Sequence, residues 1–329
     1  MIGGRLGPIA VSLFLILPAA SAQEVERDPG GIFADAQTEL LFDGAHFTEG
    51  PAMGPDGLLY FSDITWTSAS GMQAGHIWRL DPSTGHAEVF RSPSGMSNGL
   101  LFDLEGRLVA ALGADFGGRA IVRTETSTGK GFILAGLYGG RSFNSPNDLT
   151  IDEQGRIYFT DPRYQGHEPL EQPYMGVYRI DPDGTLTRLL TRVGHPNGIL
   201  VSPDQKTLYV SSAEYPMWGG LNALLAYTLG EDGSLSERRI LVDCSGFAGP
   251  DGMAIDTDGR VFATRPAGAD TGIYVYSPEG EELAFLRTPV APSNVAFGIG
   301  EYSQTLFITG GGAVHTIRTN TNGYHPQRR

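Results

Sequence analysis

The sequence predicts an all-β protein with the architecture of a six-bladed β-propeller, in which each blade has four antiparallel strands. Glycine and proline are abundant, with 46 and 21 residues, and no segment longer than about ten residues keeps a helical period. Strand-like runs also recur about every fifty residues along the chain. The six runs are LLYFS (58–62), RLVAA (107–111), RIYFT (156–160), TLYVS (207–211), RVFAT (260–264) and TLFIT (305–309).

A turn sequence precedes each of the six runs, for example PDG at 55–57 and TDG at 257–259. Turns of this kind join neighbouring antiparallel strands in a hairpin. Most runs are followed by a loop and a third strand, such as GVYRIDP (176–182), and then by a fourth strand. The even spacing of these units favours a closed propeller over stacked β-sandwiches, the competing all-β architecture.

The sequence also predicts how the ring closes and how the chain is divided. ELLFDG (39–44) precedes the first copy, and the last copy fades after HTIRT (315–319). We therefore expect the N-terminal strand to complete the last blade. The resulting division is a signal peptide at 1–22, an N-terminal extension at 23–38, a single propeller domain at 39–319 and a C-terminal tail at 320–329.

Residues 1–22 have the pattern of a secretory signal peptide. Arg5 is followed by an apolar stretch and then by Ala20-Ser21-Ala22, an A-x-A cleavage site that ends just before Gln23. The apolar stretch is too short to span a membrane, and an uncleaved signal anchor is the alternative interpretation. We expect a periplasmic or secreted protein with no membrane association after cleavage.

The charge and the cysteine content narrow the range of partners. The formal net charge is −14, which argues against nucleic acid or an anionic membrane and favours cations and a small neutral substrate. Cys244 is the only cysteine, so the chain cannot form an internal disulfide. The oligomeric state is not determined by the sequence.

Six polar residues occupy the same position in the six repeats, about nine to eleven residues before each strand-like run. They are carboxylates or carboxamides at Glu49, Asn98, Asn147, Asn197, Asp251 and Asn294. Because this position begins the innermost strand of each blade, the six side chains are expected to converge at one end of the central tunnel. Asn and Asp are also ordinary turn residues, but a turn alone would accept Gly or Ser equally well.

The chemistry of these six residues indicates a hard divalent cation. Glu49 and Asp251 carry two negative charges, and the asparagines offer neutral amide oxygens. Oxygen ligands with this charge suit calcium best, and magnesium next, because an open funnel does not impose a tight octahedron. No Cys or His stands at these positions to favour zinc, so zinc and manganese are the less favoured alternatives to calcium.

The motifs at these positions resemble the gluconolactonase and senescence-marker-protein (regucalcin-like) family of six-bladed propellers. They are EGP (49–51), NSPND (144–148), FTDPRY (159–164), PNG (196–198), SPDQKTLYVS (202–211) and PDGM (250–253), and the resemblance spans residues 40–318. It implies hydrolysis of sugar lactones at a divalent metal, often calcium. The implied metal ligands are Glu49, Asn147, Asn197 and Asp251.

Two departures from the family pattern bear on the substrate. The family often has a Glu-His-Gly stretch where this chain has ALGADFGGR (111–119). The basic residue expected directly before the Phe-Asn pair is replaced by Ser142, and Arg141 stands one position earlier. The resemblance nevertheless makes Arg141 and Asn144 candidate substrate-binding residues.

Loops at the same rim as the ligands are expected to determine substrate specificity. They are the connections 62–75, 112–119, 161–176 and 211–222, which carry several aromatic residues and few cations. Trp66, Tyr164 and Trp218 are the candidate substrate-binding aromatics, together with Asn98 from the inner positions. His195, just before PNG, could approach the metal pocket, but a solvated loop residue is the favoured interpretation.

Three carboxylates are candidates for the general base that activates water. Asp251 comes first because it is expected at the metal with a free oxygen, and Glu49 and Asp148 follow. Since Asp148 alternates with Asn147 along a strand, its side chain is expected to face the other way and to support the ligands. The leading hypothesis is an exported metal-dependent lactonase. The alternatives are a phosphotriester or fluorophosphate hydrolase at the same site and a non-catalytic ligand-binding propeller.

Overall fold

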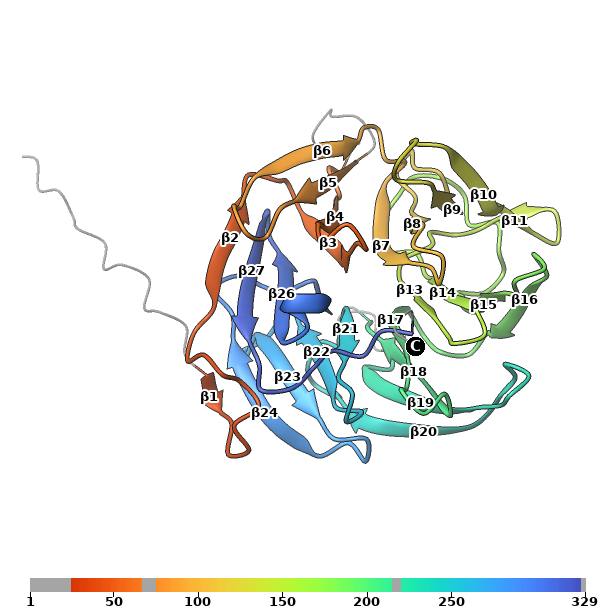
Figure 1. Cartoon of the computed structure of the whole chain (residues 1–329). Coiled ribbons are helices and arrows are strands. Elements are labelled where there is room, and N and C mark those ends of the chain that lie inside the picture. The colour runs from red at the N-terminus through yellow and green to blue at the C-terminus, as the bar shows by residue number, and fades with distance from the viewer. Residues whose placement is uncertain (1–24, 67–74, 215–219, 327–329) are drawn as a thin grey trace, which may run out of the picture.

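The structure is a computed structural model that describes residues 25–66, 75–214 and 220–326. Within these residues, six antiparallel sheets lie around a common axis (Figure 1). The predicted fold class, an all-β six-bladed propeller, is therefore confirmed. The described residues also include a short 3-10 helix, η2 (Gly300–Tyr302). None of the helices in the described residues is both long and apolar enough to cross a membrane.

Each blade runs in chain order from an inner strand to an outer strand, with two exceptions described below. The first three blades are β3 (Thr48–Met53), β4 (Leu59–Asp63), β5 (His76–Leu80), β6 (Ala87–Arg91); β7 (Ser97–Phe102), β8 (Leu108–Leu112), β9 (Ala120–Thr124), β10 (Gly131–Ala135); and β13 (Leu149–Ile151), β14 (Ile157–Asp161), β15 (Gly176–Ile180), β16 (Leu186–Leu190). The last three are β17 (Pro196–Val201), β18 (Thr207–Ser212), β19 (Ala223–Leu229), β20 (Leu235–Asp243); β21 (Met253–Ile255), β22 (Val261–Arg265), β23 (Gly272–Tyr276), β24 (Glu282–Arg287); and β25 (Asn294–Phe297), β26 (Thr305–Gly310), β27 (Ala313–Arg318), with β2.

The ring closes as expected, because the outer strand of the sixth blade comes from the N-terminal side of the chain. This strand, β2 (Glu39–Asp43), pairs antiparallel with β27, where Leu40 faces His315 (Figure 1). Two further strands, β11 (Leu137–Tyr138) and β12 (Arg141–Ser142), form a small hairpin after the second blade. The sixth blade therefore joins the two ends of the propeller through backbone hydrogen bonds.

The N-terminal extension adds a strand that the sequence analysis did not anticipate. β1 (Val25–Arg27) pairs with β24 and gives the fifth blade a fifth strand. The guanidinium of Arg27 lies 2.7 Å from the carboxylate of Glu282 and 4.6 Å from the ring centre of Phe285. β1 covers an outer edge that would otherwise leave backbone groups unpaired.

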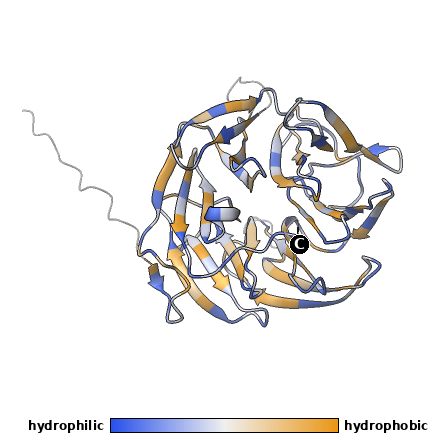
Figure 2. Ribbon diagram, viewed as in Figure 1, coloured by the Kyte–Doolittle hydropathy of each residue, from blue (hydrophilic) through white to orange (hydrophobic). Residues whose placement is uncertain are grey.

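Apolar side chains pack between neighbouring blades. Six buried clusters each join two adjacent blades around the ring. Between the fifth and sixth blades, for example, the rings of Phe262 and Phe297 meet edge to face with centroids 5.0 Å apart. Hydrophobic residues recur in the strands of every blade (Figure 2). Since each blade buries apolar surface against both neighbours, the six blades stabilise one ring rather than six separate units.

Three of the turns between first and second strands share the sequence Asp-x-x-Gly-Arg, beginning at Asp103, Asp152 and Asp256. In each, the carboxylate accepts hydrogen bonds from two backbone N–H groups of the turn and from the guanidinium of the arginine. These side chains satisfy backbone donors that the tight turn leaves without strand partners.

Candidate active site

A cavity of about 400 Å³ lies at the end of the propeller where the inner strands begin. Five of the six repeat positions line it, which brings together residues that the sequence spaces about fifty apart. They are Glu49 on β3, Asn98 on β7, Asn147 just before β13, Asn197 on β17 and Asp251 just before β21. We call these five residues the inner ring.

Glycines fix the close approach of the blades at the inner ring. Gly50 and Gly198 each follow an inner-ring residue, and a Cβ atom on either would lie 2.2 Å from the carbonyl oxygen of the inner-ring residue in the next blade. The affected carbonyls are those of Asn98 and Asp251. Only glycine permits this contact without moving the neighbouring blade. The E-G and N-G pairs in the sequence therefore have a packing role as well as a turn role.

Hydroxyl groups at the ends of several of the strand-like runs connect one blade to the next. Thr160 Oγ1 donates a 2.8 Å hydrogen bond to the carbonyl of Asn197, and Ser211 Oγ donates to the carbonyl of Pro250. Ser62 Oγ donates to Ser97 Oγ at 2.8 Å, beside Asn98. The Ser or Thr that ends five of the six runs is the sequence signal for these contacts, which the sequence analysis did not use.

The sixth repeat position differs from the other five. Asn294 does not line the cavity, and its Nδ2 donates a 3.2 Å hydrogen bond to Glu49 Oε2 instead. The expectation that all six side chains converge on one space is therefore wrong for Asn294. A Cβ atom on Gly252 would lie 2.0 Å from the Asn294 side chain, so the amide fills the space beside the fifth blade. Asn294 orients the Glu49 carboxylate.

Asn147 and Asp148 line different cavities. Asn147 borders the cavity of the inner ring, whereas Asp148 borders a separate cavity of about 140 Å³ among the inner strands. The Oδ1 atom of Asp148 accepts a 2.9 Å hydrogen bond from the N–H of Leu149. Burial raises the pKa of Asp148 to about 7. Both residues precede β13 (Leu149–Ile151) and so lie outside the strand on which the alternation was expected, yet they border different cavities.

The inner-ring carboxylates are held in an environment that disfavours their charge. Burial, followed by the negative charges of Asp251 and Asp148, raises the pKa of Glu49 well above its ordinary range. Burial and the charge of Asp148 raise the pKa of Asp251 to about 7. Among the described residues, those that line the cavity include four carboxylates, Glu49, Asp115, Glu214 and Asp251, and no Lys, Arg or His. No side-chain cation of the lining therefore balances this charge.

This donor set fits a hard divalent cation. The described residues contain no group of three or more His, Cys, Asp or Glu side chains that could hold a metal by themselves. The inner ring instead combines two carboxylates with amide oxygens, which are hard ligands for calcium. Glu49, Asn147, Asn197 and Asp251 could hold such an ion, and the nearby amide of Asn197 partly offsets the rise in the pKa of Asp251.

Aromatic and apolar side chains form the wall of the cavity above the inner ring. Trp66 and Tyr164 line it as predicted, and the rings of Trp66 and Phe47 lie 5.3 Å apart. The hydroxyl of Tyr164 donates to the carbonyl of Ala213 at 2.8 Å. Trp218, the third predicted aromatic, lies outside the described residues. The cavity thus has acidic residues at its bottom and a largely apolar wall above them.

The histidine next to the inner ring is not solvated. His195 is 8% exposed, and its Nδ1 lies 2.8 Å from Glu214 Oε1. Its ring packs against Tyr164 with centroids 5.5 Å apart. The expectation of a solvated loop residue is therefore wrong, because Glu214, which lies just after β18, covers the His195 ring. Sequence analysis missed Glu214, Met96 and Phe47 as lining residues, since they have no repeat position to identify them.

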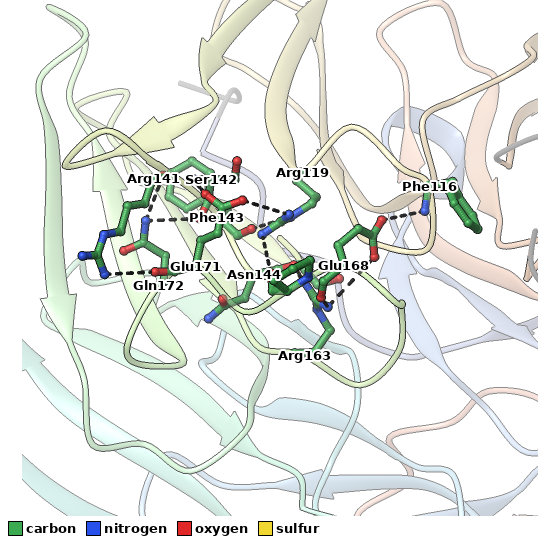
Figure 3. Close-up of polar contacts among 12 residues, drawn as sticks. Phe116, Arg119, Arg141, Ser142, Phe143, Asn144, Arg163, Glu168, Glu171 and Gln172 are labelled. Atoms are coloured by element: carbon green, nitrogen blue, oxygen red, sulfur yellow. Dashed lines mark hydrogen bonds and ion pairs between the residues drawn. The ribbon is translucent and has the colours of Figure 1, made fainter.

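Asn144 and Arg141 are not among the residues that line the cavity. Asn144 is 1% exposed, and its Nδ2 donates to the carbonyl of Tyr174 at 3.1 Å. Arg141 is exposed on the β11–β12 hairpin and donates to the carbonyl of Glu171 at 3.4 Å (Figure 3). In this arrangement both side chains organise the rim loops behind the cavity wall.

Comparison with known proteins agrees with the resemblance inferred from the motifs. Residues 47–312 match the family described as SMP-30/gluconolactonase/LRE-like region. The chain is 35% identical over 314 residues to a gluconolactonase from Zymomonas mobilis, covering 87% of this chain and 82% of that protein. It is 27% identical over 282 residues to a pentonolactonase from Haloferax volcanii, covering 84% and 85%. The solved structure of a gluconolactonase from Xanthomonas campestris superposes with a TM-score of 0.77 at 30% identity, covering 92% of this chain and 99% of that one.

Proposed function

Because the chain belongs to the SMP-30/gluconolactonase/LRE-like family, we propose that it is an exported, metal-dependent hydrolase that opens the ester bond of a sugar lactone. The observation that carries the proposal is the acidic cavity of the inner ring, whose carboxylates have no basic side chain beside them among the lining residues that the structure describes. The relatives that the chain matches over most of its length are a gluconolactonase and a pentonolactonase, which supports a lactone as the substrate class.

The residues of the inner ring have two proposed roles, metal binding and substrate binding. Glu49, Asn147, Asn197 and Asp251 would hold the divalent cation, with calcium as the proposed ion. When bound, the cation supplies Lewis-acid polarisation of the lactone carbonyl and balances charge that develops on its oxygen. Asn98, which lines the same cavity, is left free to hydrogen-bond the substrate.

Asp251 is the proposed general base. It removes a proton from the attacking water, whose oxygen forms a bond to the carbonyl carbon while the bond from that carbon to the ring oxygen breaks. The proton then passes to the departing ring oxygen, so the product is the open hydroxy acid. The amide of Asn294 orients Glu49 by donating a hydrogen bond to its carboxylate. Asp148, in the neighbouring cavity, adds negative charge near the inner ring, and this charge favours a bound cation.

Hydrolysis of a lactone panel tests this proposal. Five- and six-membered sugar lactones and aliphatic lactones are assayed before chelation, after complete chelation, and after return of calcium, magnesium, manganese or zinc. We expect sugar lactones to be hydrolysed, activity to be lost on chelation, and calcium to restore it. Turnover that survives complete chelation would contradict the metal mechanism. Hydrolysis of a phosphotriester or fluorophosphate without lactone turnover would favour the alternative hydrolase.

Metal binding can also be measured without activity. A ligand that binds only the folded state stabilises it by about 2.7 kcal/mol at a concentration one hundred times its dissociation constant. We therefore expect calcium to raise the melting temperature of the chelated protein, and Glu49→Gln to abolish this rise. A rise that Glu49→Gln leaves intact would place the ion elsewhere. Binding without any turnover would favour the non-catalytic propeller.

Export is part of the same proposal and is supported by the pattern of residues 1–22. When the full chain is expressed in a bacterial host with a periplasm, we expect the mature protein in the periplasm or medium with Gln23 as its first residue. N-terminal sequencing of the fractionated protein checks this. A cytoplasmic protein that keeps residues 1–22 would contradict export without affecting the lactonase assay.

A further inference from the structure

The loop between β8 and β9 contains a turn with an uncommon backbone conformation. Asp115 and Phe116 are consecutive and have φ values of 63° and 65°, in the left-handed region that residues with a Cβ atom seldom adopt. Gly117 follows, and a Cβ atom there would lie 2.3 Å from the carbonyl oxygen of Gly113. A turn of this kind costs conformational free energy and persists only where its surroundings hold it.

Glu168, from the rim loop of the next blade, holds this turn. Its Oε1 accepts a 2.7 Å hydrogen bond from the N–H of Phe116 (Figure 3). Its Oε2 accepts a 3.2 Å bond from the N–H of Asp115. One carboxylate thus binds the two backbone donors that the left-handed turn directs outward. Gly166 lets the two loops touch, because a Cβ atom on it would lie 2.8 Å from the nitrogen of Asp115.

Arg163 fixes Glu168 in place. Its Nη1 donates a 2.6 Å hydrogen bond to the carbonyl of Glu168, and its Nε and Nη2 donate to the carbonyl of Asn144 at 3.1 and 2.7 Å (Figure 3). Asn144 is in turn held through its N–H by Asp161 at 2.9 Å. The turn at Asp115 is therefore connected to strand β14 of the third blade through a chain of hydrogen bonds.

This chain of contacts places Asp115 in the cavity wall. Asp115 is 2% exposed and lines the cavity of the inner ring, yet it belongs to a rim loop and to none of the repeat positions. An ionised carboxylate offers only acceptors, and its hydrogen bonds from neutral hydroxyls are stronger than those between neutral groups. A lactone with several ring hydroxyls presents the matching donors.

We propose that Asp115 binds a hydroxyl group of the lactone and that Glu168 is the positioning residue that holds Asp115 in the cavity wall. The inference extends the proposed function, on which it rests, by assigning the preference for polyhydroxylated lactones to the 113–118 turn. This turn lies where the sequence departs from the family pattern, so its specificity belongs to this chain.

Glucono-δ-lactone and its single-deoxy analogues test the role of Asp115. In Asp115→Ala we expect kcat/KM for glucono-δ-lactone to fall about 10- to 100-fold, mainly through KM, because one charge-assisted hydrogen bond is lost. For the analogue that lacks the bound hydroxyl, the wild type and Asp115→Ala are expected to be equal. The calcium-induced rise in melting temperature is expected to stay unchanged, since Asp115 is outside the proposed ligand set.

The role of Glu168 is tested with a matched control in the same loop. Glu168→Ala is expected to reproduce the rise in KM for glucono-δ-lactone, and Glu168→Gln to restore part of the loss, because its single carbonyl oxygen can accept one of the two N–H groups. Glu171→Ala is the control. Glu171 accepts from the N–H of Ser142 at 3.0 Å and pairs with Arg119 at 3.6 Å, but neither contact involves the turn.

Several outcomes would overturn the inference. Hydroxyl binding would be contradicted if Asp115→Ala lowered kcat/KM equally for every lactone, or if each deoxy analogue were as much poorer than glucono-δ-lactone as it is for the wild type. Loss of the calcium-induced rise in melting temperature would also contradict it. If Glu168→Ala fails to fold, Asp115→Asn is used to test hydroxyl binding by Asp115, because this substitution changes no backbone contact. A wild-type protein that hydrolyses no lactone would overturn the proposed function itself. An active wild type with an Asp115→Ala variant of unchanged kcat/KM would overturn only this inference.

Discussion

Replacement of Asp251 by asparagine is expected to lower kcat/KM for lactone hydrolysis by about two to four orders of magnitude, the usual contribution of a general base. The substitution keeps the size of the side chain and removes the proton acceptor. It also removes one negative charge from a site where burial and the charge of Asp148 raise the pKa of Asp251 to about 7. The melting temperature of the chelated protein is therefore expected to stay equal or to rise.

The measurement for Asp251→Asn is steady-state kinetics on a sugar lactone at saturating calcium, beside a melting curve of the chelated protein. Asp183→Asn is the matched control, because Asp183 lies in an exposed turn where its carboxylate accepts one N–H bond, from Thr185 at 2.9 Å. Activity of Asp251→Asn within a few-fold of the wild type would remove Asp251 from the role of base. The assignment would then pass to Glu49 or Asp148.

Replacement of Asp152 by alanine is expected to have the largest effect on stability. Asp152 is fully buried, and its carboxylate accepts bonds from the N–H groups of Gln154 and Arg156, from Arg156 Nε at 2.5 Å and from the hydroxyl of Tyr158 at 3.0 Å. The substitution would leave Arg156, itself buried, without its counter-charge. Removing one partner of a buried ion pair costs roughly 3 to 5 kcal/mol of unfolding free energy.

Urea unfolding of Asp152→Ala checks this expectation, with Asp183→Ala as the exposed-turn control and a predicted change below about 0.5 kcal/mol. The Asp152 turn follows β13 and lies at the end of the blade opposite the inner ring. Activity per folded molecule is therefore expected to stay near that of the wild type. A stability close to the wild type would show that water replaces the carboxylate in the turn.

Much of the fold could be predicted because the repeat can be recognised from short local sequence patterns. Each strand-like run is short, bounded by a turn and repeated six times, so strand number and blade number follow from hairpin chemistry alone. The pairing of β2 with β27 was predictable because one strand was missing from the last copy. The fifth strand β1 was not, because three residues at a sheet edge carry no periodic pattern.

The candidate site divides in the same way. Glu49, Asn98, Asn147, Asn197 and Asp251 could be found from their shared place in the repeat, since equivalent positions in a closed ring must meet at its axis. Asn294 shares that place but hydrogen-bonds Glu49 instead of lining the cavity. His195 and Glu214 were missed as a pair because their contact depends on the course of one loop.

The sequence by itself determined the number of blades, the closure of the ring and the six repeat positions, five of which form the inner ring. All of these follow from residue type and from a period along the chain. Only the tertiary structure decided which rim residues reach the cavity, how Glu168 holds the turn at Asp115, and why Asn144 and Arg141 stay behind the wall. These depend on contacts between loops far apart in the chain, whose conformations are set by packing and hydrogen bonding and not by local periodicity.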